Sequence, residues 1–153
     1  MNYQQQMQRI VSDYRHTGQP WPASAKEMAA WAIREGKWDL QPSAVLQKCA
    51  EDIAEAMRHE YFTDRKGRRV RLLHPAMVKR QGEFFTEWDD IRTAPRKHMQ
   101  LSFQQRRKAI VGDCRQLKVD LDSFNDAHSK EEPLQVSFDF NMDLAELEAA
   151  NAA

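Results

Sequence analysis

The stretch that decides the fold of this chain runs from residue 23 to residue 71. It reads ASAKEMAAWAIREGKW (23–38), DLQPSAVLQKCAEDIAEAMRHE (39–60) and YFTDRKGRRVR (61–71). In the first two segments apolar residues recur every three or four positions, which predicts two helices joined by a short turn. The third segment places aromatic and aliphatic residues on either side of a basic turn, which predicts a β-hairpin with a basic tip.

Individual residues mark the ends of these elements. Ser24 followed by Glu27 fits a capping box, and Gly36 suits the C-terminal end of the first helix. Pro42 suits the first turn of the second helix, and Gly67 permits a positive φ in the hairpin turn. A helix-turn-helix followed by a β-hairpin is the order of elements in a winged helix, a module that is common among nucleic-acid-binding proteins.

The remaining segments extend this plan. Residues 2–15 and 95–124 have helical periodicity, and residues 78–91 predict a second strand pair or a longer wing. Alternating apolar residues over 134–140 predict a strand, and residues 143–150 a short acidic helix. We expect an α+β, mostly helical fold. It comprises a winged-helix-like domain with a basic β-hairpin wing (1–94), a long helix that braces or dimerises the protein (95–128) and an acidic tail (129–153).

The charges are distributed very unevenly along the chain, although 23 basic and 23 acidic residues give a net charge of zero. Residues 58–108 contain 14 basic and 6 acidic side chains, a net charge of +8. Residues 109–153 contain 3 basic and 10 acidic side chains, a net charge of −7. A basic middle segment indicates a surface that binds a polyanion, and the acidic tail either binds a separate partner or folds back over that surface.

The basic residues of the middle segment concentrate in two predicted turns. The string RKGRRVR places five cations within seven residues, and a second turn follows at KRQG. Arginine and lysine at a hairpin tip contact phosphates with an affinity that falls with salt, although a solvated basic turn has the same composition. We interpret these residues as contacts to DNA, double-stranded rather than single-stranded; they are Arg65, Lys66, Arg68, Arg69, Arg71, Lys79 and Arg80.

Other classes of site have weaker support. None of the five histidines has a partner at a metal-ligand spacing, Cys49 and Cys114 fit free buried thiols, and no glycine-rich phosphate loop is present. We expect no metal, no cofactor, no catalytic residue and no enzymatic activity. A metal-dependent nuclease is the enzymatic alternative, and its carboxylates would come from Glu83, Glu87, Asp89 and Asp90. The spacing of Trp21, Trp31 and Trp38 favours a structural role over base stacking.

Two further segments suggest contacts with proteins. Apolar residues recur every seven positions in the long helix, which is the pattern of a coiled-coil seam and predicts a homodimer through Phe103, Ile110, Leu117 and Phe124. Residues 131–153 combine an alternating apolar pattern with acidic residues, which suits a segment that binds another protein. The same segment also suits a last strand of the protein's own sheet, which is the interpretation that we prefer. No segment has the length of a membrane span or the pattern of a signal peptide, so we expect a cytoplasmic protein.

Residues 24–71 resemble the HARE-type winged helix-turn-helix. The likeness lies in AKEMAAWAIREGKW, in VLQKCAEDIAEAM and in the aromatic strand entry of YFTDRKGRRVR. That family occurs in a bacterial RNA polymerase accessory subunit, in some restriction enzymes and in chromatin regulators. The resemblance implies a role in association with nucleic acid or polymerase, and it carries over no catalytic residue.

We therefore expect a DNA-binding protein of bacterial or phage origin that acts as a transcription regulator or accessory factor. The alternative is a protein-interaction adaptor with a winged-helix fold and no enzymatic activity. It would use the acidic tail and the acidic exposed face predicted for the helix from Pro42 to Met57.

Overall fold

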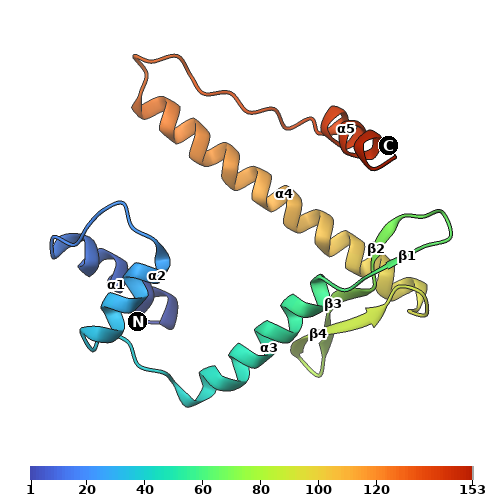
Figure 1. Cartoon of the computed structure of the whole chain (residues 1–153), viewed down its shortest axis with the longest axis horizontal. Helices are drawn as coiled ribbons and strands as arrows, with labels where there is room; N and C mark the ends of the chain where they lie inside the picture. The colour runs from blue at the N-terminus through green and yellow to red at the C-terminus, as the bar shows by residue number, and fades with distance from the viewer. Residues whose placement is uncertain (153) are drawn as a thin grey trace. The chain divides into compact units, whose positions relative to one another are not determined.

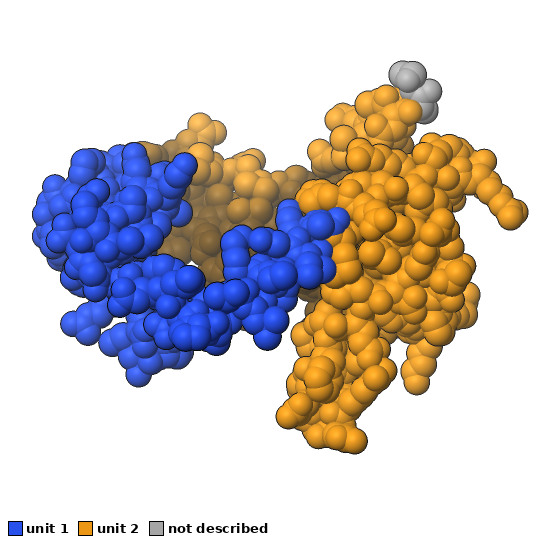
Figure 2. Space-filling model, turned by 60° about the horizontal axis from the view of Figure 1, so that its bottom comes forward, with its two compact units in different colours: residues 1–56 blue, residues 57–153 orange. Residues whose placement is uncertain are grey.

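The computed structural model describes residues 1–152, in which five helices and two antiparallel β-hairpins occur (Figure 1). This is the α+β, mostly helical class that the sequence predicts. The chain divides into two compact units, Met1–Ala56 and Met57–Ala153, which are distinguished in Figure 2. We describe each unit by itself. Among the described residues, no helix combines the length and the apolar character that crossing a bilayer requires.

The core of the first unit lies between α1 (Tyr3–His16) and α2 (Ala25–Arg34). Ser24 and Glu27 form the predicted capping box at the start of α2. The ring of Tyr14 meets the ring of Trp31 edge to face, with 5.4 Å between centroids, and its hydroxyl donates to the carbonyl of Pro20 over 3.1 Å. Trp31 is thus a core residue, as its spacing indicates.

Helix α3 (Pro42–Arg58) begins at the predicted proline but has no buried residue. Its apolar stripe is exposed, with 60% of Val45 and 78% of Leu46 accessible to solvent. Trp38, in the turn before α3, packs against the α1–α2 core instead of the helix. Its indole N–H donates to the hydroxyl of Tyr3 over 2.9 Å. The prediction of buried free thiols is wrong for Cys49, which is exposed on the same helix.

The second unit contains two β-hairpins that are joined through one residue. Strands β1 (Tyr61–Thr63) and β2 (Arg69–Arg71) form the first hairpin, and Gly67 adopts the expected positive φ of 79° in its turn. Strands β3 (Leu73–Arg80) and β4 (Glu83–Asp90) form the second. Leu72 links them, because its N–H donates to the carbonyl of Glu60 and its carbonyl accepts from the N–H of Ile91, each over 2.9 Å.

Polar side chains of helix α4 (Arg96–Ala127) form hydrogen bonds with the backbone of β3. The amide group of Gln105 accepts from the N–H of Met77 over 2.7 Å and donates to the Met77 carbonyl over 2.9 Å. The hydroxyl of the buried Ser102 donates to the carbonyl of Pro75 over 2.6 Å. Residues 75 and 77 share one edge of the strand, so α4 satisfies backbone groups that β4 does not reach.

The tail differs from its prediction in one respect. The short acidic helix is present as α5 (Asn141–Ala152), but residues 134–140 belong to no strand. The prediction of a strand over residues 134–140 is therefore wrong, because a strand also needs a second strand to which its backbone is hydrogen-bonded. Leu134 instead exchanges two hydrogen bonds with the side-chain amide of Asn125, at 2.9 and 3.0 Å.

We predict that Gln105→Ala destabilises the second unit by about 1 kcal/mol, because two backbone groups of Met77 lose a partner. Gln104→Ala is the matched control, since Gln104 is exposed on the neighbouring position of the same helix. Urea unfolding followed by circular dichroism measures both. Equal stability of the two variants would contradict the role assigned to Gln105.

Candidate nucleic-acid interface

The turn of the β1–β2 hairpin is organised by the carboxylate of Asp64. This carboxylate accepts from the backbone N–H groups of Lys66 and Arg68, each over 2.9 Å, and from the Arg68 guanidinium over 2.7 Å. These hydrogen bonds, chiefly those from Arg68, lower the pKa of Asp64 below its usual value. The turn is thus a defined structure built on an ionised carboxylate.

The five predicted cations of this hairpin have different surroundings. Arg65 and Lys66 are exposed at the tip, whereas Arg68 is ion-paired with Asp64. The guanidinium of Arg69 lies 4.1 Å from the centroid of the Tyr61 ring. Arg71 lies at the base of the hairpin, and its side chain is partly buried. Positive charge therefore extends from the base to the tip.

Lys79 and Arg80 lie at the turn of the other hairpin. Arg80 pairs with Glu87 over 2.6 Å, and the amine of Lys79 lies 5.5 Å from the centroid of the Phe84 ring. Lys79 lies six positions after Leu73 at the hairpin base, a distance of about 20 Å along β3. These two predicted residues thus belong to a separate part of the hairpin surface.

One face of the β3–β4 hairpin forms the wall of a cleft of about 310 Å³. The register places Pro75 opposite Trp88 and Met77 opposite Thr86, so these four side chains share that face. Ser102 and Gln105 of α4 line the cleft as well, and they are the residues that fix the helix to β3. The shape of the cleft is therefore set by hydrogen bonds between side chains of α4 and the backbone of β3.

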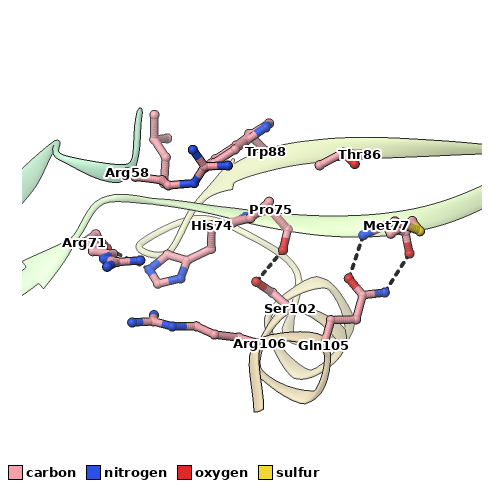
Figure 3. A pocket seen from close by; sticks show the side chains of 11 residues that line it. Arg58, Arg71, His74, Pro75, Met77, Thr86, Trp88, Ser102, Gln105 and Arg106 are labelled. Carbon is pink, nitrogen blue, oxygen red and sulfur yellow. Dashed lines mark hydrogen bonds between the residues drawn. The ribbon is translucent and has the colours of Figure 1, made fainter. Parts of the chain in front are cut away.

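Three arginines from three different elements line this cleft: Arg58 at the end of α3, Arg71 in β2 and Arg106 in α4 (Figure 3). The guanidinium of Arg58 lies 5.9 Å from the centroid of the Trp88 ring. None of the described residues that line the cleft is acidic. Guanidinium groups donate paired hydrogen bonds to oxyanions, so a cleft lined by three of them suits phosphate or another anion.

A buried histidine holds the backbone at this site. His74 is 4% exposed, and its Nε2–H donates to the carbonyl of Arg71 over 2.8 Å. The ring of Phe103 meets it edge to face, with 5.7 Å between centroids. His98 donates in turn to the carbonyl of His74 over 2.9 Å. This chain of contacts joins α4 to the end of β2 and so positions Arg71.

Of the cleft arginines, the sequence analysis selected only Arg71. Arg106 lies in the basic first half of the long helix, which is the one sequence signal that points to it. Arg58 is a single cation at the end of a helix, and Trp88 is one aromatic residue in a strand. Their contact joins residues 30 positions apart, and Leu72 holds the two segments together through its hydrogen bonds with Glu60 and Ile91.

The carboxylates considered for a nuclease have other contacts. Asp90 accepts from the Arg92 guanidinium over 2.8 and 3.1 Å, and these hydrogen bonds lower the pKa of Asp90. Asp89 accepts from the N–H of Asp90 over 2.7 Å. Within residues 1–152, no group of three or more histidine, cysteine, aspartate or glutamate side chains is arranged to hold a metal ion.

The fold and the cleft define a class of site, a cleft lined by arginines on a β-hairpin beside a helix. No family model matches the chain, and neither a curated protein nor a solved structure is similar to it at a significant level.

We predict that the β1–β2 turn loses order in acid. The folded-state pKa of Asp64 lies below its unfolded value of about 3.9, so the ionised group stabilises the turn above that pH. This contribution disappears as the pH falls through the folded-state pKa. The amide chemical shifts of residues 64–69, followed by NMR from pH 6 to pH 2, should move toward random-coil values at the acidic end.

Asp64→Asn is the control for this titration, because it keeps a side-chain oxygen but has no ionisable carboxyl group. The acid-dependent movement of the turn amides should be absent in this variant. A movement of the same size and midpoint would show that another group causes it.

Proposed function

We propose that this protein binds double-stranded DNA through the phosphate backbone and acts as a transcription regulator or accessory factor. The observation that carries the proposal is the convergence of Arg58, Arg71 and Arg106 on one cleft. Guanidinium groups donate two parallel hydrogen bonds to a phosphate, and phosphate contacts provide most of the affinity in sequence-independent binding.

The extent of the positive charge favours a polymer over a single small anion. Arg69 and Arg71 lie two positions apart in β2 and therefore share one face of the strand. Arg65 and Lys66 continue the basic surface at the exposed tip of the same hairpin. A row of cations that starts in a cleft and follows a hairpin suits successive phosphates of a nucleic acid.

The winged helix-turn-helix assignment of residues 24–71 is part of this proposal. It is supported by the order of the elements, in which α2, the turn at Gly36, α3 and the β1–β2 hairpin follow one another. The hairpin would act as the wing and contact the backbone. Helix α3 would not read bases with the face that carries Glu51 and Asp52, since acidic side chains there repel phosphate.

We predict that the combined substitutions Arg58→Ala, Arg71→Ala and Arg106→Ala weaken binding to duplexes of all sequences. The slope of log K against log salt should fall by about 1 for each phosphate contact that is lost. Fluorescence anisotropy with a labelled random duplex and with its single strand measures both quantities between low and physiological salt.

The matched control removes three exposed cations from the first unit, Arg9→Ala, Lys26→Ala and Arg34→Ala, and changes the net charge by the same amount. This variant should retain its affinity and its salt slope. If both triple variants lose affinity equally, binding reflects net charge alone and the cleft is not the site. Absence of any salt-sensitive binding by the intact chain would overturn the proposal.

A second candidate function, a protein-interaction adaptor, is supported by exposed apolar surface. The tail exposes 57% of Leu134 and 63% of Leu147, beside acidic side chains. In the first unit, an apolar groove of about 490 Å³ lies along α1 and α2 and includes Met7, Val11 and Ile33. Exposed apolar residues beside polar ones are typical of surfaces that bind other proteins.

Truncation after Ser129 separates the two functions. For the DNA-binding function, we predict that the truncated chain binds the labelled duplex at least as tightly as the intact chain, because the removed residues carry six acidic side chains and one basic side chain. For the adaptor function, neither chain binds DNA, and truncation abolishes co-purification with a protein partner. Tighter DNA binding after truncation would identify the tail as an inhibitor of the basic surface.

A further inference from the structure

Helix α4 presents two different faces. His98, Ser102 and Gln105 point to β3, where each forms a hydrogen bond with the strand backbone. Phe103, Ile110, Leu117 and Phe124 repeat every seven residues and, at 100° per residue, lie on another face, more than 90° away from Ser102 and Gln105 on average. The contact with β3 therefore leaves the seam from Ile110 to Phe124 available, whereas Phe103 also meets the ring of His74.

The seam is open along its length in the described chain. Solvent reaches 48% of Phe103, 53% of Ile110, 45% of Leu117 and 46% of Phe124. Cys114 and Leu121, four positions after Ile110 and Leu117, are partly exposed and continue the alternating steps of four and three from Ile110 to Phe124, whereas the position four after Phe103 is Arg107. Ser102 is the one buried residue that the helix has among its 32. Such a seam is the surface that a second helix covers in a coiled coil.

The charges of α4 select the direction of that second helix. Residues 96–111 contain five basic and no acidic side chains, whereas residues 112–127 contain two basic and four acidic ones. Parallel association of two copies would place the two strongly basic halves side by side. Antiparallel association places each basic half beside the acidic half of the other copy, and opposite charges along a seam favour that orientation.

We propose that α4 forms an antiparallel homodimer through the seam Phe103, Ile110, Cys114, Leu117, Leu121 and Phe124. A register with Phe103 opposite Leu121 of the second copy places Cys114 opposite Ile110 and Leu117 opposite Arg107, so four of the six layers from Phe103 to Leu121 are apolar. The two Phe103 side chains then lie about 27 Å apart along the axis, for a rise of 1.5 Å per residue. Each copy keeps its contact between α4 and β3.

The first test is the oligomeric state of the full chain by light scattering across a concentration series, without nucleic acid. A reversible dimer is expected, and Ile110→Lys with Leu117→Lys should convert it to a monomer. The control is Val119→Lys, because Val119 is 52% exposed on the opposite side of the same helix. A chain that stays monomeric at all concentrations overturns the proposal, as does a dimer that survives the seam substitutions or is lost in the control.

The second test determines the orientation in a background with Cys49→Ser and Cys114→Ser. Phe103→Cys and Leu121→Cys are introduced separately, and the chains are treated with a short bismaleimide alone and as a mixture. Antiparallel association gives efficient cross-linking only in the mixture. Efficient cross-linking of Phe103→Cys with itself shows parallel association and overturns the proposal.

These outcomes do not depend on the DNA-binding function, because both tests are made without nucleic acid. Ile110 and Leu117 are already exposed, so their replacement removes no part of the core of a single copy, whereas Phe103→Cys also removes a ring contact with His74. Circular dichroism of each variant checks that the helix content is unchanged. Failure of the dimer leaves the cleft arginines and their own test unaffected.

Discussion

The contact on which the second unit depends is made by the side chain of Gln105, which pairs with both backbone groups of Met77. A two-stranded hairpin is marginally stable by itself, because each strand has one edge without partners. Gln105 and Ser102 supply partners at that edge, and the same contact aligns α4 with β3. Arg106 follows Gln105 directly, so the helix register that satisfies Met77 also brings a guanidinium to the cleft.

Local sequence signals were sufficient for much of the fold. These signals determine backbone geometry over a few residues each. They are the capping residues Ser24 and Glu27, the proline at the start of α3 and Gly67 in its turn. The same signals are insufficient where a partner decides the outcome. The apolar stripe of α3 and the alternating residues 134–140 have the patterns of buried elements. In the described structure, however, α3 has no buried residue and residues 134–140 belong to no strand.

The candidate site shows the same division between local and distant information. The basic hairpin tip was apparent because Arg65, Lys66, Arg68 and Arg69 are neighbours in the sequence. The cleft was not, since Arg58, Arg71, Trp88 and Arg106 come from four elements and meet through the β3–β4 register and the contact between α4 and β3. Composition predicted an anion-binding surface within residues 58–108, whereas the residues that line the cleft became apparent only through the hydrogen bonds of Gln105, Ser102 and His74.

The scarcity of buried apolar side chains has a thermodynamic consequence. In residues 1–152 the buried hydrophobic residues are few, and Ala76 is the one with no exposed surface. The heat capacity change of unfolding depends mainly on the apolar area that becomes exposed, and polar contacts such as those of α4 with β3 oppose it. A single copy of the chain therefore has a flat dependence of stability on temperature, with a broad thermal transition and little loss of stability on cooling.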